Sequence, residues 1–441
     1  MARHGLVRRA IHRQMCDGDL GARLMIDPAI REDPFPYYDQ LRAQGRIVNA
    51  GLALVSAHHD VCLAVLRSPD FGQVRLDRLP GPLRLALKIG GRPVLGPLEP
   101  PSMLATDPPE HTRYRKLVTR AFSVRSVAAM RSRVEEVAEE LLDEIARSTP
   151  SGGPTVDLVA RYASLLPATV IAEMLGAPVA MRRQFLDWGA GAALSLDIGL
   201  TYRDFRRSEQ DLAALHRWML GHFAEVRRAP RDDVLSALVT AHDQGDRLTL
   251  DELSSIAMLL LAAGFETTVN LLGNGAVLLL RHPDQLLALQ AEPQRWAGAV
   301  EEILRYESPV QRTGRVALQD TEVAGRRVGA GSFVSLLLGG ANRDPEVFAD
   351  PNRFDVQRPE AAENLAFSSG VHYCIGAALA RLEGEVGLRA LFQRFPDLAL
   401  AAPPHRRPTR VLRGYDTIPI QPFSPNTRSH SASPHSAGPA G

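Results

Sequence analysis

Apolar residues recur at helical spacing over most of the chain, and two short stretches read as extended. Helical spacing predicts helices over 127–145, 156–175 and 182–228, the last with a Gly/Ala-rich break at 189–193. Residues 47–55 resemble a hairpin and residues 309–317 a strand. The pattern is typical of a mainly α-helical protein with small β-sheets.

The longest predicted helix starts at a capping box, Thr249 to Glu252, and runs to about Arg281, where Pro283 ends it. Such a helix would span about 50 Å, enough to cross a whole domain. Acidic and amide side chains interrupt its apolar run. We therefore interpret it as a buried central helix and not as a membrane span.

Composition narrows the class of protein. The chain has 441 residues, a net charge of +1 and three cysteines, which lie far apart. Without a long linker or charge block, we expect an N-terminal extension (1–30), a single domain (31–422) and a disordered Ser/Pro/His tail (423–441). The charge gives no argument for nucleic acid binding. The odd cysteine count and an N-terminus without an apolar core predict a cytoplasmic protein with no membrane anchor.

A ten-residue stretch near the C-terminus, 367–376, places Cys374 directly before a predicted helix. Unpaired N–H groups at a helix start stabilise a thiolate, and Gly370 and Gly376 leave room for a flat ligand such as haem. The alternatives are a buried structural cysteine, a zinc ligand and a nucleophile. Only His372 is nearby as a second zinc ligand, and no partner histidine for a nucleophile is indicated.

The middle of the central helix, Ala263 to Thr268, is unusual for a core helix. Gly264 weakens a helix by about 1 kcal/mol relative to alanine, and burying Glu266 is costly. Small residues followed by an acid and two hydroxyls, Thr267 and Thr268, fit a flat ligand lying on the helix beside a proton route. The alternative is a helix crossing at Gly264, with Glu266 reaching solvent.

Four motifs together resemble those of the cytochrome P450 family. The haem-binding signature F-G-x-G-x-H-x-C-x-G is matched at Phe367, Gly370, His372, Cys374 and Gly376. Ser368 stands where the family usually has glycine. Residues 263–268 resemble the A-G-x-E-T-T oxygen-activation motif, and residues 107–115 the D-P-P-E-H-T-R-x-R motif. Glu302 and Arg305 resemble the E-x-x-R pair.

The resemblance implies a cytochrome P450 fold in which haem b lies between the central helix and the cysteine loop. Cys374 is then the axial ligand of the haem iron. The implied propionate partners are His111, Arg115, Arg315 and His372. The other implied haem contacts are Ala263, Gly264, Phe367, Gly370 and Gly376.

The resemblance also implies a reaction. Glu266, Thr267 and Thr268 would deliver protons to bound dioxygen. The enzyme would be a monooxygenase that hydroxylates or epoxidises a largely apolar small molecule, with electrons from NAD(P)H through ferredoxin reductase and ferredoxin. A peroxide-using enzyme of the same fold and a non-catalytic haem-thiolate sensor remain alternatives, although neither needs the acid and hydroxyl as placed.

Three further residues are implied to be structural. In the family the E-x-x-R pair is buried near the thiolate loop and joined by an arginine, here most naturally Arg358. Glu302, Arg305 and Arg358 would thus form one ion cluster.

Strand alternation gives an expectation for the substrate pocket. If Arg315 faces a propionate, then Thr313 and Gln311 share its side and Arg312 turns away. We expect Val310 and Gln311 to line the pocket, with the Gln311 amide binding a polar group of the substrate. The alternative is a Gln311 that bonds a backbone group or water.

The helix that begins near Pro109 suggests a partner surface. If Arg115 turns inward, then Arg113, Lys116 and Arg120 lie on its other faces. We expect at least some of these cations to attract an acidic ferredoxin. A merely solvated face is the alternative.

Overall fold

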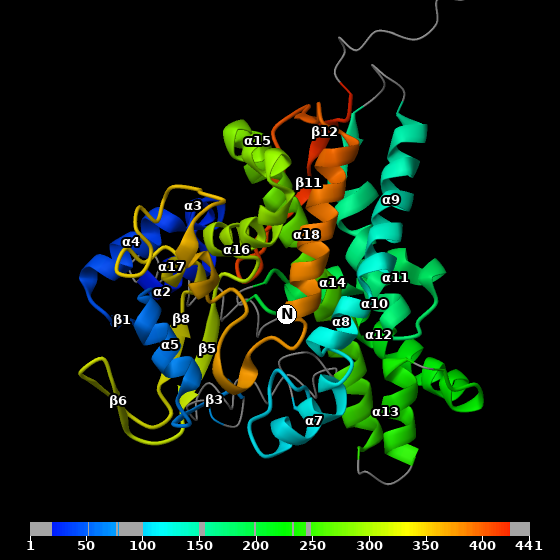
Figure 1. Ribbon diagram of the computed structural model, residues 1–441. Helices are drawn as coiled ribbons and strands as arrows, with labels where there is room; N and C mark the ends of the chain where they lie inside the picture. The colour runs from blue at the N-terminus through cyan, green and yellow to red at the C-terminus, as the bar shows by residue number, and fades with distance from the viewer. Residues whose placement is uncertain are drawn as a thin grey trace, which may run out of the picture.

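The structure is a computed structural model that describes residues 20–51, 53–75, 78, 100–149, 155–197, 200–231, 233–243 and 248–423. It is mainly helical, with four small sheets among these residues (Figure 1). The tail predicted to be disordered lies outside the described residues, apart from Phe423. Most of the proline- and glycine-rich stretch before Pro109 also lies outside them.

The helices differ widely in length. In chain order they are α2 (Leu20–Ile26), α3 (Pro28–Glu32), α4 (Phe35–Gln44), α5 (His59–Arg67), α7 (Glu110–Thr119), α8 (Val124–Ala129), α9 (Arg131–Ser148), α10 (Leu165–Met174), α11 (Arg182–Leu194), α12 (Tyr202–Arg228), α13 (Val234–Asp243), α14 (Leu250–Arg281), α15 (Pro283–Ala291), α16 (Trp296–Tyr306), α17 (Leu338–Ala341) and α18 (Ala377–Arg394).

The strands are short. The largest sheet has the order β1 (Val48–Ala50), β2 (Ala53–Ser56), β8 (Phe333–Leu336), β5 (Thr313–Ala317) and β3 (Phe71–Gly72). A second sheet contains β4 (Val156–Asp157), β12 (Pro419–Gln421) and β9 (Ala399–Leu400). The two remaining pairs are β6 (Thr321–Val323) with β7 (Arg326–Val328) and β10 (His405–Arg406) with β11 (Tyr415–Thr417).

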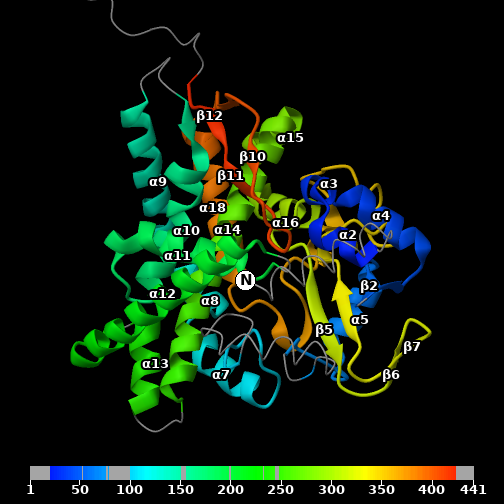
Figure 2. The same cartoon turned by 180° about the vertical axis from the view of Figure 1, so that it is seen from behind.

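Helix α14 is the centre of the helical half. It starts at the capping box, where Thr249 accepts a hydrogen bond from the N–H of Glu252 and the Glu252 carboxylate accepts one from the N–H of Thr249. Helices α10, α11, α12 and α18 pack around it, as both views show (Figures 1 and 2). It is the one helix among the described residues that is long and apolar enough to cross a membrane, and its most apolar window is 72% buried. It is therefore the core helix of the fold.

The five-stranded sheet lies on the other side of the molecule, beside α4 and α5 (Figures 1 and 2). Its β5 pairs antiparallel with β8, with Arg315 opposite Val334. This pairing positions Arg315 next to the helical half.

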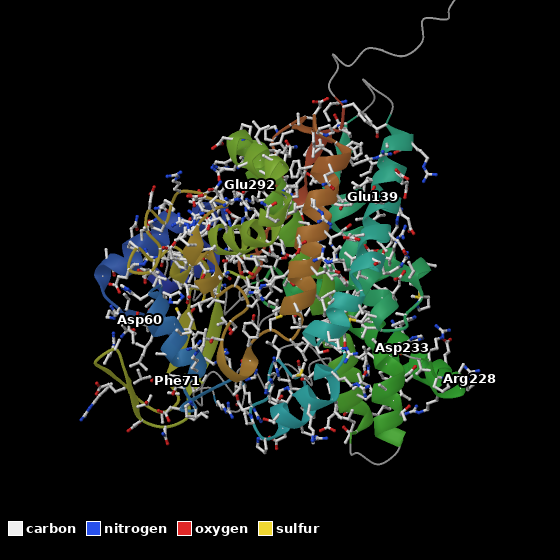
Figure 3. All side chains as sticks on the ribbon, viewed as in Figure 1. Asp60, Phe71, Glu139, Arg228, Asp233 and Glu292 are labelled. Carbon is white, nitrogen blue, oxygen red and sulfur yellow. The ribbon has the colours of Figure 1, made fainter. Side chains whose placement is uncertain are left out.

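Charged side chains cover the outer helices. Glu139 on α9 and Glu292, after α15, lie at the outside of the molecule (Figure 3). The inner face of α9, including Val134 and Leu142, is buried. This separation is the one that helical spacing predicts.

Two sequence expectations about helices are wrong. The break predicted at 189–193 is absent, because α11 runs through it and ends at Leu194. A Cβ at Gly189 would meet Phe265 at 2.1 Å, so this glycine allows α11 to approach α14 closely. The helix predicted over 156–175 instead begins with β4 and a π-helical turn, Val159–Ala163.

The N-terminal extension expected over residues 1–30 is also structured in its described part. Leu24 of α2 and Ile30 of α3 are buried in one apolar cluster with Tyr38 and Leu41 of α4. Residues 20–30 thus belong to the folded unit.

Candidate functional site

A cavity of about 510 Å³ lies between α14 and the loop that carries Cys374. Its walls are mostly apolar and come from segments far apart in the chain, including Leu24 and Met25 of α2, Leu260 of α14 and Leu412 after β10. A largely apolar wall with a few polar groups is typical of small-molecule sites.

Cys374 borders this cavity, and its exposed surface faces it. Its N–H donates to the carbonyl of Phe367 (3.0 Å), and α18 begins three residues later at Ala377. Burial raises the pKa of the Cys374 thiol, although the N–H of Gly376 and the charges of Arg115 and Arg381 lower it. The helix start alone therefore does not make a thiolate here, and the charge of a bound iron would have to complete that stabilisation.

The two glycines beside Cys374 have different roles. A Cβ at Gly376 would meet only the Cys374 sulfur, at 3.9 Å, so this side stays open as expected. Gly370 has a φ of +70°, and a Cβ there would meet the carbonyl oxygen of Leu66 at 2.3 Å. Gly370 is thus needed for its left-handed backbone and for contact with α5, which corrects the expectation that it makes room for a ligand.

A buried basic cluster lies beside the cavity. The His111 and His372 rings are in contact, with their centroids 4.1 Å apart and their planes tilted by 49°, and Arg115 and Arg315 line the same cavity. Burial lowers the pKa of Arg315 to about 10, and burial together with His372 and Arg115 lowers that of His111 to about 4. Asp107, 3.8 Å from His372 Nε2, is the nearby carboxylate.

The basic cluster has more cations than anions. Among the described residues Arg115 has no carboxylate partner, and Arg315 bonds only the Thr313 hydroxyl (3.3 Å) and the Gly314 carbonyl (2.8 Å). Within the described part of the chain, the buried Nε2 of His372 has no hydrogen-bond partner. Two propionates would supply the missing charges and acceptors, so these residues fit haem.

The cavity face of α14 presents Ala263 and Thr267. The Thr267 hydroxyl donates to the carbonyl of Ala263 (3.1 Å) and lies at the cavity wall. Gly264 also borders the cavity, but a Cβ there would meet Ile171 of α10 at 2.7 Å. The helix crossing considered from the sequence is therefore real, and it explains Gly264 better than a ligand does.

Glu266 is 4% exposed and does not reach solvent. It forms an ion pair with Arg407, which follows β10. Arg407 also lies 3.6 Å from Asp416, an exposed residue of β11. These groups connect the cavity with the surface.

Thr268 also borders the cavity and is 2% exposed. It lies near Glu383 of α18, whose two buried carboxyl oxygens have no hydrogen-bond partner among the residues that the structure describes. Burial raises the pKa of Glu383 to about 8, and the Thr268 hydroxyl only partly opposes this. The Glu383 carboxyl is therefore largely protonated at neutral pH.

Glu302 and Arg305 are fully buried and joined by two hydrogen bonds of 2.6 and 2.7 Å. Arg358 lies 3.3 Å from the same carboxylate. Arg305 also donates to the carbonyls of Asn342, Pro351 and Arg353. The structure thus brings together the three residues assigned to a structural cluster, and it shows that they hold the 342–358 segment in place.

The structure contradicts the pocket assignment of Gln311. Its side chain is 2% exposed, donates to the carbonyl of Ser308 (2.8 Å) and accepts from the Tyr38 hydroxyl (3.3 Å). Val310 and Arg312 line the cavity instead. Strand β5 begins only at Thr313, so alternation counted back from Arg315 does not extend to these positions.

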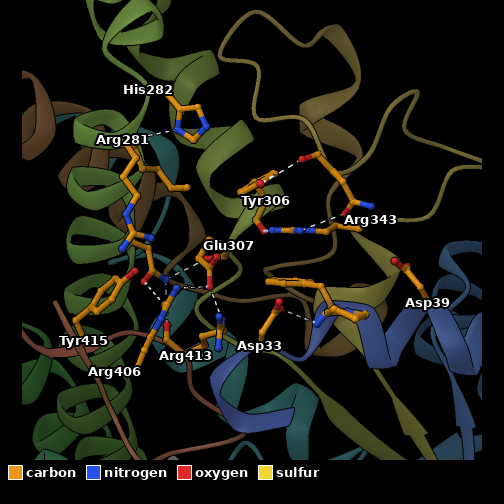
Figure 4. A pocket seen from close by; sticks show the side chains of 15 residues that line it. Asp33, Asp39, Arg281, His282, Tyr306, Glu307, Arg343, Arg406, Arg413 and Tyr415 are labelled. Carbon is orange, nitrogen blue, oxygen red and sulfur yellow. Dashed lines mark hydrogen bonds and ion pairs between the residues drawn. The ribbon is translucent and has the colours of Figure 1, made fainter. Parts of the chain in front are cut away.

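Among the described residues, a second hollow shares no lining residue with this cavity and does not include Cys374 (Figure 4). At its base Glu307 is paired with Arg413 and lies 3.2 Å from Arg406. Although burial opposes ionisation, Arg413, Arg406 and Arg343 lower the pKa of Glu307 to about 2. Arg413 also donates to the carbonyls of Arg31 and Glu32. Because Glu307 is paired with these arginines and Arg413 also binds backbone carbonyls, we interpret this hollow as structural.

Comparisons with known proteins agree with this geometry. The cytochrome P450 family model matches residues 191–400, which include Glu266 and Cys374. Cytochrome P450 140 of Mycobacterium tuberculosis is 48% identical to the chain over 424 residues, covering 95% of this chain and 96% of that protein. The chain belongs to the cytochrome P450 family.

Further P450 comparisons support the fold and the enzyme class. The cytochrome P450 monooxygenase PikC of Streptomyces venezuelae is 39% identical, covering 91% of this chain and 94% of that protein. The ligand-free crystal structure of CYP164A2 from Mycobacterium smegmatis matches with a TM-score of 0.82 and 35% identity, covering 91% of this chain and 99% of that one. The P450 fold expected from the sequence is confirmed, and the protein is a P450 monooxygenase that uses haem.

Two charged residues near the cavity of this P450, Arg407 and Glu383, were not predicted from the sequence. Arg407 lies in an arginine-rich stretch with no motif, and its partner Glu266 is about 140 residues away. Glu383 follows Cys374 by nine residues and lies on α18, which starts at Ala377 and packs against α14. The sequence signal for Glu383 was an acidic residue within an otherwise apolar face of a helix.

Proposed function

We propose that this P450 uses dioxygen and two electrons to hydroxylate or epoxidise a largely apolar small molecule. The observation that carries the proposal is one cavity with Cys374 at one wall and Glu266 and Thr267 at another. Haem bound at Cys374 supplies the activation of dioxygen, which the thiolate sulfur promotes. The apolar remainder of the cavity wall excludes charged or strongly hydrated molecules.

The chain's own residues hold the haem in this proposal. Cys374 binds the iron, and Arg115, Arg315, His111 and His372 hold the propionates through charge-assisted hydrogen bonds. The basic cluster has few acidic partners, so burying its charges costs free energy. Hydrogen bonds to the propionates would offset that cost.

The proton route in this proposal begins at the surface. Asp416 is exposed, Arg407 lies between Asp416 and Glu266, and Glu266 is the next residue to Thr267. The Thr267 hydroxyl at the cavity wall would accept a proton from the Glu266 carboxyl as it gives its own proton to a group bound in the cavity. In this proposal the Glu266 carboxylate regains its proton from the Asp416 side, when its ion pair with Arg407 opens and water enters between them.

A ferredoxin, reduced through ferredoxin reductase by NAD(P)H, is the proposed electron donor in the cytoplasm. Of the cations expected to attract it, Arg113 is partly committed to an ion pair with Glu252, whereas Lys116 and Arg120 are exposed. Charge reversal at Lys116 should therefore slow electron delivery more than charge reversal at Arg113, and added salt should reduce the difference.

The proposed function has a two-part test. The reduced protein treated with carbon monoxide should show the red-shifted Soret band of a thiolate haem, and Cys374→Ser should lose it. A panel of steroids, macrolactones and fatty acids is then tested for turnover under two conditions. One supplies ferredoxin, ferredoxin reductase and NADPH, and the other supplies hydrogen peroxide alone. Thr267→Ala should release more peroxide or water per electron, whereas Thr417→Ala, on exposed β11, should not.

Product formed only with hydrogen peroxide would refute the use of dioxygen. A thiolate band retained by Cys374→Ser would refute the ligand assignment. An unchanged product yield per electron in Thr267→Ala would remove Thr267 from the proton route.

A further inference from the structure

Arg312 is a charged residue on a mostly apolar wall of the substrate cavity. It is half-buried, and within the described chain its side chain has no hydrogen bond and no ion pair. An uncompensated guanidinium at such a place is costly unless an anion binds it.

A second arginine lies opposite Arg312 on the neighbouring segment. Val310 pairs antiparallel with Leu412, and the N–H of Gln311 donates to the carbonyl of Val411 (2.8 Å). Continuing this register places Arg312 directly opposite Arg410. Side chains at such positions have Cβ atoms about 5 Å apart, and like charges there repel.

Arg410 also has incomplete partners. Its Nε is buried and has no hydrogen-bond partner among the described residues. The positive charges of Arg31 and Arg312 act on Arg410 and, after burial, lower its pKa, while Asp197 raises it. Arg410 thus lies opposite Arg312, which is part of the cavity wall, and Arg31 of α3 acts on Arg410 from outside that wall.

The acidic groups around these arginines are already used. Both oxygens of Asp197 accept backbone N–H groups, those of Arg410 (2.9 Å) and Val411 (2.8 Å). Burial raises the pKa of Asp197, although Arg312, the two N–H groups and Arg410 lower it, so Asp197 balances these two arginines only in part. Asp27 is paired with Arg23 at 3.2 Å and caps α3. The edge of the cavity therefore keeps an excess of positive charge.

Other buried arginines of this P450 have a carboxylate partner, which Arg312 and Arg410 lack in the described structure. Arg305 has Glu302, Arg413 has Glu307 and Arg407 has Glu266, each as a direct ion pair. Since two guanidinium groups and one aspartate leave an excess of about one charge, a singly charged group balances them better than a doubly charged one.

We propose that Arg312 and Arg410 form an anion site at the edge of the cavity, and that the substrate is an apolar molecule bearing a carboxylate. The carboxylate would accept from both guanidinium groups, while the apolar part extends along the cavity toward Ala263 and Thr267. This substrate class rests on the monooxygenase function proposed above and narrows it.

The test compares acids with their uncharged esters. Octanoic, dodecanoic and hexadecanoic acids and their methyl esters are titrated into the haem-loaded protein, and affinity is read both from the Soret shift and from equilibrium dialysis. We expect at least one acid to bind about tenfold or more tightly than its ester, and the preference to shrink at high salt. Dodecyl phosphate is the third arm of the titration.

Substitutions of the two arginines test whether they cause the preference for the acid over the ester. Arg312→Gln and Arg410→Gln should each weaken the acid about tenfold and leave the ester unchanged, Arg312→Lys should retain part of the preference, and Arg327→Gln on exposed β7 should change neither. Acid and ester bound equally by the unmodified protein, or weakened equally by Arg312→Gln, would overturn the proposal, and tighter binding of dodecyl phosphate would overturn the carboxylate assignment.

The carbon monoxide spectrum separates the two proposals. If the thiolate band is present and the acid preference is absent, only the anion site is wrong. If the thiolate band is absent, the proposed function is wrong, and the dialysis measurement still tests the site because it does not depend on the haem spectrum.

Discussion

Glu383→Gln should change how stability depends on pH. In the folded protein the Glu383 carboxyl is 1% exposed and its pKa is raised to about 8, against an ordinary value of 4.5. Below the ordinary value both folded and unfolded chains carry the proton, so the group costs nothing. As pH rises toward 8, the unfolded chain releases the proton while the folded chain keeps it, so the free energy of unfolding falls.

The size of the effect follows from the shift in pKa. Each unit of difference corresponds to about 1.4 kcal/mol, which gives a cost of roughly 3 kcal/mol at neutral pH. Glutamine has a similar shape and no proton to release, so Glu383→Gln should remove this slope. The variant should therefore be more stable than the unmodified protein near pH 7.5 by about 3 to 4 kcal/mol, and by about 1 kcal/mol or less near pH 5.

The assay is urea unfolding of the haem-loaded protein, followed by circular dichroism at several pH values. Glu385→Gln is the matched control, since Glu385 lies on the same helix but is paired with Arg131 (3.0 Å). That control should keep the pH slope and lose at most about 1 kcal/mol. If the unmodified protein and Glu383→Gln lost stability in parallel between about pH 5 and pH 7.5, the reasoning about burial would be refuted.

Three other substitutions test the packing around the site, each by urea unfolding. Ser368→Gly should raise the free energy of unfolding by up to about 1 kcal/mol, because Ser368 has a φ of +61°; a lower value in the variant would contradict a strained backbone. Arg305→Met should cost about 3 to 5 kcal/mol by leaving Glu302 buried without its main partner, and purified protein should contain less haem; stability equal to that of the unmodified protein would show that the cluster is dispensable. Gly264→Val should cost about 1 to 3 kcal/mol by pressing on Ile171, and Ile171→Ala in the same chain should recover part of it; no recovery would place the strain elsewhere.

Local signals in the sequence predicted the main features of the fold. The central helix was predicted with both ends, because its start is a capping box and its end is a proline, and both act within a few residues. The Cys374 loop and the Glu302–Arg305 pair were found for the same reason, since their residues are close in sequence. The structure places them around one cavity or beneath it.

Features that depend on distant residues were not predictable in this way. The role of Gly264 depends on Ile171 of another helix, and the Glu266 ion pair depends on Arg407 near the end of the chain. The side on which Gln311 lies depends on its pairing with the segment at Val411, which alternation within one strand cannot reveal.

The first described helix has a consequence for specificity. Gly21, Leu24 and Met25 of α2 form part of the cavity wall, so the amino-terminal segment determines the shape of the space that a substrate fills. Exchanging Met25 for a larger or smaller side chain should therefore leave the haem spectrum intact and alter which molecules the cavity admits. A segment far from Cys374 in the sequence would in this way set specificity without touching the residues that carry out the reaction.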